Sequence, residues 1–288
     1  MKTAKSSLLL LPLLGLALLA GCNKTEEPTK PAVASVSYLE KIKARDKLIV
    51  GVFTDKPPFG FVNEAGRYVG FDTDIGRQFA KDLLGDENKV EFVAVEPASR
   101  IPFLQSDKVD LILANMTVTP ERKEAVEFTN PNLKVAVQAL VPQGSSVKKL
   151  DDLATRTTIV TTGATADIWL TKNHPDWKLL KFEKNSESLQ ALANGRGDAY
   201  AQDNLVLFSW AKQNPGYRVL EEKLGAEAPI APAVKKGNLE LRDWVNSELA
   251  KLGEEKYLLK LYDQYVRKEL SDDTKPESVI VEGGKWQG

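Results

Sequence analysis

The sequence predicts an α/β protein of two similar lobes, each a mixed, mostly parallel sheet flanked by helices. Apolar strand-like runs alternate with helical patterns over most of the chain, an order that favours largely parallel sheets. In addition, residues 104–115 (LQSDKVDLILAN) align with residues 192–203 (LANGRGDAYAQD), and the alignment places Asn115 opposite Asp203. This short repeat indicates two lobes built alike, with these two residues at matching strand ends.

Composition excludes several classes of protein. The 288-residue chain is 42% hydrophobic and 27% charged, with a formal net charge of −1, as in ordinary globular proteins. It lacks the basic surplus typical of nucleic-acid binders. We find no metal-ligand spacing, phosphate-binding glycine loop or nucleophile motif, so we expect no metal, no cofactor and no catalytic residue.

The N-terminus has the pattern of an export signal. Lys2 and Lys5 precede an apolar run of 13 residues, 8–20, which is too short to span a bilayer. The run ends in LAGC, residues 19–22, which resembles the lipobox of bacterial lipoproteins. We predict a signal peptide over 1–21, then lipidated Cys22 and a flexible tether over 22–37. A plain signal peptide with an incidental cysteine is the alternative; Cys22 is the only cysteine, so no internal disulfide can form.

The first lobe is predicted from alternating strands and helices. Residues 47–53, 90–95 and 109–115 read as strands, and residues 99–105 as a short helix. The segment 71–85 places Phe71, Ile75, Phe79 and Leu83 on one helical face, and Gly85 marks its end. A later helix, 254–269, is expected to return to this lobe.

The second lobe follows the same order. We expect strands at 157–162 and 198–203 and helices at 163–172 and 186–195. Two extended segments, 131–143 and 228–237, lack helix signals and look like paired crossovers. The predicted division is therefore lobe 1 over 38–135 plus 230–270, lobe 2 over 136–229, and a C-terminal tail over 271–288. In such α/β sheets, ligands bind beyond the carboxyl ends of strands, which locates the site between the lobes.

The start of the helix predicted at residue 120 indicates that an anion lies nearby. Thr119 reads as an N-cap and Pro120 as the first helical residue. Arg122 then lies in the first turn, where the helix dipole is positive and a cation is mildly unfavourable. A neighbouring negative group would remove that cost. The simplest alternative is that Arg122 pairs with Glu121 or Glu124 on an exposed helix face.

Three motifs resemble the family-3 extracellular solute-binding proteins of ABC transporters for polar amino acids. They are GFDTDIGRQFAKDL (70–83), ANMTVTPERK (114–123) and GDAYAQD (197–203). The resemblance covers residues 38–268 or so, and is strongest to the branch of cysteine-binding lipoproteins. It implies a two-lobed, type II periplasmic-binding-protein-like fold that binds a free polar L-amino acid, acts as a monomer, partners a permease and an ATPase, and is anchored outside the cytoplasm of a bacterium.

The same resemblance assigns roles to individual residues. The α-carboxylate of the amino acid would be held by Arg122, Thr117, Ala164 and Thr165. The α-ammonium would be held by Asp203 and by the backbone carbonyl of Asn115. An arginine offers a planar fork that binds a carboxylate through two hydrogen bonds, and a helix start such as 164–165 favours an anion.

Four residues would contact the ligand side chain: Arg100, Phe53, Lys56 and Asn185. Basic amino-acid binders usually carry an aspartate where Phe53 stands and an aromatic where Lys56 stands, so a basic ligand is disfavoured. Arg100 matches an arginine of dicarboxylate binders and could also hold a thiolate, since cations lower a thiol pKa. We expect L-cysteine, with aspartate or glutamate as the alternative; Lys56 could also be a solvated loop residue.

Two other classes stay open at this point. The fold has been recruited for dehydratase chemistry, but the single histidine, His174, reads as an exposed loop residue. An enzyme would need an acid or base that is not already committed to the ligand. A lipid-anchored surface antigen or sensor is the third possibility.

Overall fold

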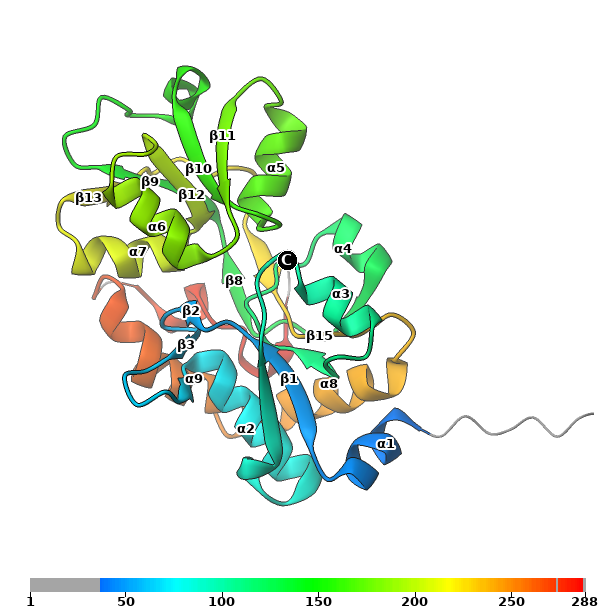
Figure 1. Ribbon diagram of the computed structural model, residues 1–288. Coiled ribbons are helices and arrows are strands. Elements are labelled where there is room, and N and C mark those ends of the chain that lie inside the picture. The colour runs from blue at the N-terminus through cyan, green and yellow to red at the C-terminus, as the bar shows by residue number, and fades with distance from the viewer. Residues whose placement is uncertain (1–36, 273, 287–288) are drawn as a thin grey trace, which may run out of the picture. The chain divides into compact units, whose positions relative to one another are not determined.

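The computed structural model describes residues 37–272 and 274–286 (Figure 1). The expected signal peptide, Cys22 and the tether up to residue 36 lie outside the described residues. Ser37, the last residue of the expected tether, is the N-cap of the first helix, where its hydroxyl accepts from the Glu40 amide at 3.2 Å. Within the described ranges, no helix combines the length and apolar character that crossing a bilayer requires.

The first lobe is built on a five-stranded sheet in the order β5-β1-β6-β15-β7. Parallel pairs join β1 to β5 and β6, and antiparallel pairs join β15 to β6 and β7. The strands are β1 (Leu48–Val52), β5 (Val90–Ala94), β6 (Leu111–Ile112), β7 (Val126–Phe128) and β15 (Ala233–Lys235). A smaller sheet beside it contains β2 (Asp55–Lys56), β3 (Gly60–Val62) and β4 (Tyr68–Val69).

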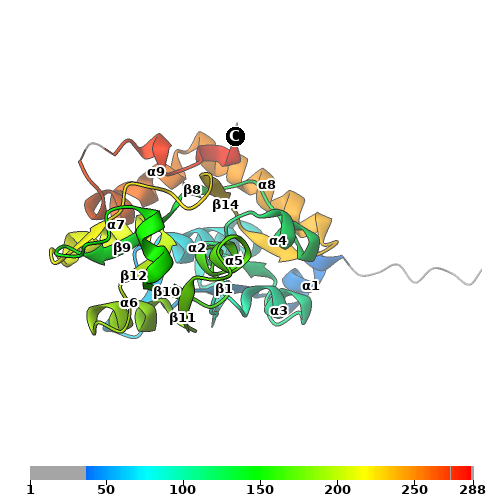
Figure 2. The same ribbon diagram turned by 90° about the horizontal axis from the view of Figure 1, so that it is seen from above.

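Helices cover both faces of this sheet. Figure 2 shows α8 and α9 along one side of the molecule and α3 along the other. The side chains of α2, α8 and α9 share one buried cluster with β1, and α3 shares another with β6. The helices are α1 (Tyr38–Arg45), α2 (Phe71–Leu84), α3 (Arg100–Gln105), α4 (Pro120–Ala125), α8 (Leu239–Glu254) and α9 (Tyr257–Leu261).

The second lobe repeats the arrangement with a sheet in the order β11-β10-β12-β9-β13. It again has two parallel and two antiparallel pairings. Its strands are β9 (Val137–Pro142), β10 (Thr157–Thr161), β11 (Lys178–Phe182), β12 (Ala199–Asp203) and β13 (Tyr217–Val219), and its helices are α5 (Thr165–Asn173), α6 (Asn185–Ala193) and α7 (Asn204–Gln213). The predicted α/β class with mixed sheets flanked by helices is therefore confirmed.

Two strands connect the lobes (Figure 1). β8 (Leu133–Val135) leads from the first sheet to the second, and β14 (Ala228–Ile230) leads back. They pair antiparallel, with Leu133 opposite Ile230. The prediction of paired crossovers is confirmed, and the pair forms a narrow hinge.

The helix boundaries follow local chemistry. α2 ends at Gly85, whose φ of 80° is the left-handed conformation that glycine adopts without strain. It begins after Gly70, where a Cβ would lie 2.4 Å from the Phe59 carbonyl oxygen. In α4, Thr119 Oγ1 accepts from the Arg122 amide at 3.2 Å and Pro120 occupies the first position. The end signal of α2 and the start signal of α4 were read correctly.

The helical region over residues 239–269 differs from the prediction. The expected helix 254–269 is α9, followed by a π-helical turn (Tyr262–Val266) and a 3₁₀ turn (Arg267–Glu269). Helix α8 was not predicted; it ends just before Lys256, which has a positive φ of 53°. That left-handed residue separates the two helices and interrupts the continuous periodicity that the prediction assumed.

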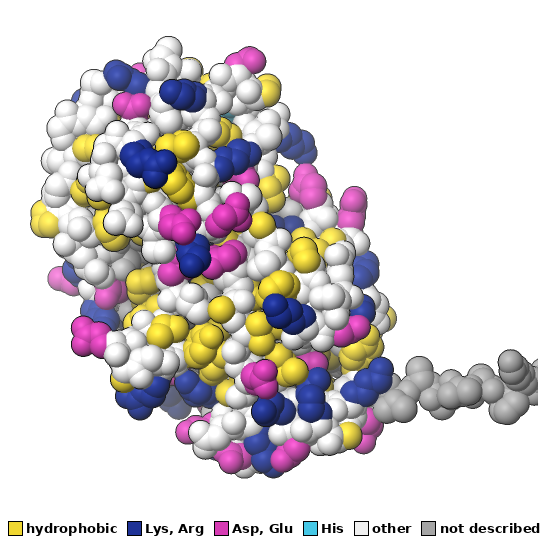
Figure 3. Space-filling view, viewed as in Figure 1, with side chains coloured by type: hydrophobic (Ala, Val, Ile, Leu, Met, Phe, Trp, Pro, Cys, Tyr) yellow, Lys and Arg dark blue, Asp and Glu magenta, His cyan; other side chains and the backbone are white. Residues whose placement is uncertain are grey.

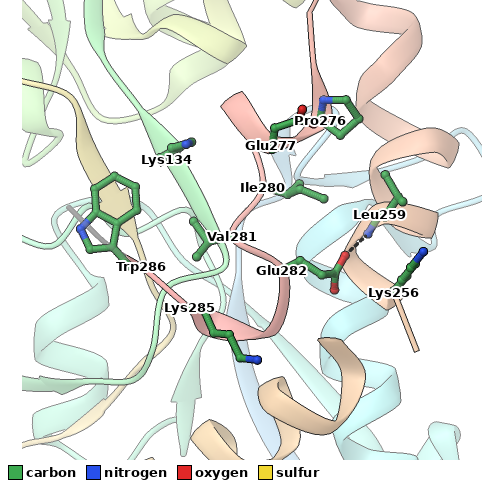
Figure 4. Close-up of a pocket in the computed structure, with 10 residues that line it drawn as sticks. All are labelled: Lys134, Lys256, Leu259, Pro276, Glu277, Ile280, Val281, Glu282, Lys285 and Trp286. Atoms are coloured by element: carbon green, nitrogen blue, oxygen red, sulfur yellow. Dashed lines mark hydrogen bonds between the residues drawn. The ribbon is translucent and has the colours of Figure 1, made fainter. Parts of the chain in front are cut away.

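The segment expected to be an irregular tail packs against the hinge. The Lys134 amide donates to the Val279 carbonyl, and the Val281 amide donates to the Asn132 carbonyl, each at 2.9 Å. A pocket lies between this segment, β8 and α9, and its lining residues are drawn in Figure 4. Its volume is about 600 Å³. Glu282 lies in its wall and accepts from the Leu259 amide at 2.8 Å. The tail thus pairs with β8 through an isolated antiparallel bridge between Leu133 and Ile280.

Candidate functional site

The loops that follow the strands of both sheets surround a small cavity. The volume of the cavity is about 10 Å³, roughly the room for one water molecule. Phe53 comes after β1, Asn115 after β6, and Asp203 ends β12. The lining residues are Phe53, Lys56, Pro97, Arg100, Asn115, Ala164, Thr165, Gln202 and Asp203. The lobes are therefore closed on each other at this point.

Arg122 lies behind one wall of the cavity, and its guanidinium joins the two lobes. Nη1 donates to the Thr117 carbonyl at 2.9 Å and to Thr165 Oγ1 at 3.1 Å, and Nη2 donates to the Gly163 carbonyl at 3.1 Å. The side chain is only 4% exposed. The alternative that Arg122 pairs with Glu121 or Glu124 on a wet helix face was wrong, because Arg122 is buried and donates to Thr117, Thr165 and Gly163 instead. Glu121 binds Lys172 of the other lobe at 3.1 Å.

The opposing helix start approaches this guanidinium closely. Ala164 is the N-cap of α5, as predicted, and Thr165 Oγ1 donates to Thr117 Oγ1 at 3.0 Å. Gly163 has a φ of 74°, and a Cβ there would lie 2.8 Å from Cα of Ala98 in the first lobe. Glycine therefore permits both the turn and the contact between the lobes.

Asp203 and Asn115 meet at the side chain of Lys56. The Lys56 ammonium donates to Asn115 Oδ1 at 2.7 Å and to Asp203 Oδ2 at 2.9 Å. Lys56 is 3% exposed, so its reading as a solvated loop residue was wrong. Among the described residues, Asp203 Oδ1 and Asn115 Nδ2 are buried without a hydrogen-bond partner. Buried polar atoms of this kind are rare.

The Asn115 carbonyl has a different partner from the one expected. It accepts from Arg100 Nη1 at 3.3 Å, and the Ala114 carbonyl accepts from the same nitrogen at 3.0 Å. Arg100 Nε donates to the Pro97 carbonyl at 3.1 Å. The guanidinium carbon lies 5.6 Å from the centre of the Phe53 ring, and Lys56 Nζ lies 5.3 Å from it. Phe53 thus separates two cations.

Asn185 is buried but does not line the cavity. Its Nδ2 donates to Asp55 Oδ1 at 3.3 Å, and its Oδ1 accepts from Gln202 Nε2 at 2.9 Å. The side-chain oxygen of Gln202, Oε1, accepts in turn from the Asp203 backbone amide at 2.9 Å. In this closed arrangement Asn185 supports Gln202, and Gln202 is the side chain that faces the cavity.

Burial changes the ionisation of this cluster. Removal from water lowers the pKa of Arg122 to about 10, against the opposing attraction of Asp203 and Glu121. It also lowers the pKa of Lys56, while Asp203 raises it. Desolvation raises the pKa of Asp72 to about 7, although Lys56 and a hydrogen bond from the Asn115 amide act in the opposite direction. Arg122 remains charged at neutral pH, because its lowered pKa of about 10 is still well above 7.

The raised pKa of Asp72 predicts that stability depends on pH. Folded Asp72 keeps its proton up to about pH 7, whereas an unfolded aspartate loses it near pH 4. Between these values the folded state binds more protons, so stability falls as the pH rises. We expect Asp72→Asn to flatten the decline in melting temperature between pH 4.5 and 7. Asp151→Asn, at an exposed position, should leave it unchanged; an unaltered slope in Asp72→Asn would contradict the assignment.

Glu96 is a second acidic residue with a raised pKa, and it lies where the two lobes meet. Desolvation raises the pKa of Glu96 to about 7, with further contributions from Asp55, Glu187 and Glu183 and an opposing one from Lys184. Figure 3 shows acidic side chains gathered around a basic one where the lobes meet. These groups come from both lobes, so closure brings like charges together there.

His174 does not contribute to the site. Its ring lies 4.0 Å from that of Trp177 and 5.3 Å from that of Trp169, as centroid distances. His174 is half-buried rather than exposed, because the two tryptophan rings pack beside it. The residue stands at the end of α5 and does not line the cavity.

Comparisons with known proteins agree with this arrangement. Residues 48–268 match the bacterial extracellular solute-binding proteins, family 3. A structure of a cysteine-binding protein from Campylobacter jejuni is 44% identical with a TM-score of 0.84, over 86% of this chain and 100% of that one. A solute receptor for L-cysteine from Neisseria gonorrhoeae is 45% identical with a TM-score of 0.83, over 85% and 99%.

Another relative is named for a different ligand, glutamine. The ABC transporter glutamine-binding protein GlnH of Bacillus subtilis (strain 168) is 35% identical over 266 residues, which are 91% of this chain and 97% of the relative. The family match spans both sheets and the hinge strands. The chain therefore belongs to the bacterial extracellular solute-binding proteins of family 3.

Proposed function

We propose that this protein is the amino-acid-binding component of an ABC importer and that its ligand is L-cysteine. The observation that carries the proposal is the pair of buried, oppositely charged groups from opposite lobes, Arg122 and Asp203, beside one cavity. A zwitterion is the ligand that matches a guanidinium on one side and a carboxylate on the other. The α-carboxylate would bind Arg122 and the start of α5, and the α-ammonium would bind Asp203.

The unpartnered atoms support this orientation. Within the described part of the chain, Asp203 Oδ1 has no donor and could accept from an ammonium group, and Asn115 Nδ2 has no acceptor and could donate to a side-chain or carboxylate atom. Because Arg122 now binds two carbonyls and two hydroxyl-bearing threonines lie beside it, a ligand carboxylate would replace weaker acceptors with a charged one. Charge-assisted hydrogen bonds are about twice as strong as neutral ones.

The charge balance favours an anionic side chain. Lys56, Arg100 and Arg122 carry three positive charges, and Asp72 and Asp203 carry at most two negative ones. With both carboxylates ionised, a ligand with a net charge of −1 would balance the site; with Asp72 protonated, the positive surplus is larger still. Cysteine meets this condition as a thiolate, whose free pKa of about 8.5 is lowered by neighbouring cations. A basic amino acid would add a fourth cation beside Arg100 and Lys56.

The affinity that a small amino acid can reach has an upper bound. In the closed arrangement the cavity has room for only about one water molecule, so the lobes must move apart to admit any amino acid. Cysteine has about seven heavy atoms, and about 1.5 kcal/mol per atom is the ceiling for small ligands. The maximum is therefore roughly 10 kcal/mol, which permits submicromolar affinity.

Three other amino acids are candidate ligands of the same receptor: glutamine, aspartate and glutamate. Glutamine is favoured by the name of the Bacillus relative and by the amide groups of Asn115 and Gln202 at the cavity. Aspartate and glutamate fit the surplus of cations. No residue of the cavity supplies an uncommitted catalytic acid or base, so the dehydratase alternative lacks support among the described residues.

A thermal-shift panel tests the ligand. Purified protein is heated with each of the twenty L-amino acids under reducing conditions, and a ligand raises the melting temperature through mass action. We expect the largest rise with L-cysteine. A larger rise with L-glutamine or L-aspartate would replace cysteine by that ligand, and a largest rise with L-arginine or L-lysine would overturn the charge argument.

The remaining assignments are part of the same proposal. The receptor would be monomeric, would be anchored through a lipid at Cys22 on the outer side of a bacterial membrane, and would deliver its ligand to a permease driven by an ATPase. Support comes from the family, whose members are extracellular, and from the sequence around Cys22. Loss of membrane association in Cys22→Ser would be the direct sign of the anchor.

A further inference from the structure

The residues Asp55 and Lys56 make two contacts with the opposite lobe. Both stand on β2 of the first lobe. Lys56 binds Asp203 at the end of β12 in the second lobe, in an ion pair whose side chains are 3% and 4% exposed. Asp55 accepts from the Ser186 amide at 2.9 Å and from Asn185 Nδ2 at 3.3 Å.

The contact of Asp55 is a helix cap supplied from the other lobe. Asn185 and Ser186 are the first residues of α6, and no side chain of the residue before them caps that helix. A carboxylate at a helix N-terminus binds free amides and meets the positive end of the dipole. Asp55 therefore gains its partner only when the lobes are together.

Lys56 binds only one of the two carboxylate oxygens of Asp203. Oδ2 accepts from Lys56, while Oδ1 is buried without a partner among the described residues. Lys56 also holds Asn115 Oδ1, which leaves Asn115 Nδ2 free. One ammonium thus fixes the orientation of both side chains and presents one acceptor and one donor to the cavity.

We propose that Asp55 and Lys56 form a built-in interlobe clasp, in which Lys56 is the positioning residue that turns Asp203 Oδ1 toward the ligand ammonium. The positioning role rests on the proposed function, whereas the clasp does not. The clasp stabilises the closed arrangement in the absence of ligand, and the ligand then adds to it. Lys56 also supplies the positive charge that makes the site prefer anionic side chains.

The clasp is tested without any ligand. Small-angle X-ray scattering of ligand-free protein should give a larger radius of gyration for Lys56→Met than for the unchanged protein. Lys56→Arg keeps the charge and should restore the smaller value. Lys47→Met, at a surface ion pair with Glu91 within the first lobe, is the matched control and should scatter as the unchanged protein does.

A second variant addresses the other half of the pair. Asp55→Asn keeps the size of the side chain but loses the charge at the start of α6, and it should also expand the ligand-free protein. If Lys56→Met and Asp55→Asn both leave the radius of gyration unchanged, the clasp is overturned, whatever happens to affinity. If the ligand panel fails altogether, the scattering result still decides on the clasp.

The positioning role is tested by affinity and selectivity. With the ligand found in the panel, Lys56→Met should weaken binding about tenfold or more by calorimetry. For cysteine, the loss should be larger at pH 8.5, where more thiolate is present, than at pH 6.5. Equal losses at both values, or unchanged affinity, would overturn the role of Lys56, because a purely structural effect does not follow the ionisation of the ligand.

Discussion

Replacing Arg122 with alanine is expected to abolish detectable amino-acid binding in a calorimetric titration. The guanidinium is buried, reaches both lobes and is hydrogen-bonded to Gly163 and Thr165 at the start of α5. A hydrogen bond to a charged group contributes about 1.5–3 kcal/mol, so loss of a two-bond contact should weaken binding at least about 100-fold. Arg122→Lys should recover only part of the affinity, because an ammonium lacks the planar fork.

The control for this variant lies one residue away. Lys123 stands on the same helix but is exposed, and Lys123→Ala should bind as the unchanged protein does. Near-native affinity in Arg122→Ala would show that the carboxylate is held elsewhere. Arg122→Ala should also lose the hydrogen bonds to Gly163 and Thr165, so ligand-free closure should weaken as well.

Replacing Asp203 with asparagine should have an effect of similar size for a different reason. The substitution removes the acceptor proposed for the ligand ammonium and leaves Lys56 buried without its counter-charge. Breaking a buried pair on one side costs about 3–5 kcal/mol. We therefore expect no measurable binding and a lower melting temperature than in the unchanged protein.

A charge-matched control separates this effect from a change in net charge. Asp176 is exposed, and Asp176→Asn changes the formal charge equally but should alter neither affinity nor melting temperature. The double variant Lys56→Met with Asp203→Asn should be more stable than Asp203→Asn alone, because no buried charge is left unpaired. If Asp203→Asn binds its ligand normally, the assignment of the ammonium group is wrong.

Closure connects these residues to transport. Contacts between the lobes involve Arg122, Lys56 and Asp55 on one side and residues of the second lobe on the other. A ligand shifts an open–closed equilibrium by its difference in affinity for the two states. Because the proposed ligand would bridge Arg122 of one lobe and Asp203 of the other, we expect it to bind the closed state more tightly, with the rotation occurring in β8 and β14.

Much of the fold was readable from local sequence. The N-cap at Thr119 and the stop at Gly85 set helix boundaries through contacts within four residues, and such contacts leave a direct signature in the sequence. The alternation of strands and helices gave the class. The repeat that aligned Asn115 with Asp203 also had a physical counterpart, since both side chains bind the same ammonium.

The parts that were missed depend on distant contacts. Lys56 and Asp203 are 147 residues apart, and Asp55 is 131 residues from Ser186; no periodicity or cap signal joins such residues. The tail was read as irregular because its strand-like contact with β8 involves only a few residues, Val279–Val281. Gln202 was missed as a lining residue because its strand is buried throughout.

The most direct measurement is a structure of the protein with its amino acid bound. The account predicts one small molecule in the interlobe cavity, with its carboxylate hydrogen-bonded to Arg122 and its ammonium within hydrogen-bond distance of Asp203 Oδ1. A ligand bound in the pocket beside the C-terminal segment, or in the cavity with neither group touched, would contradict it.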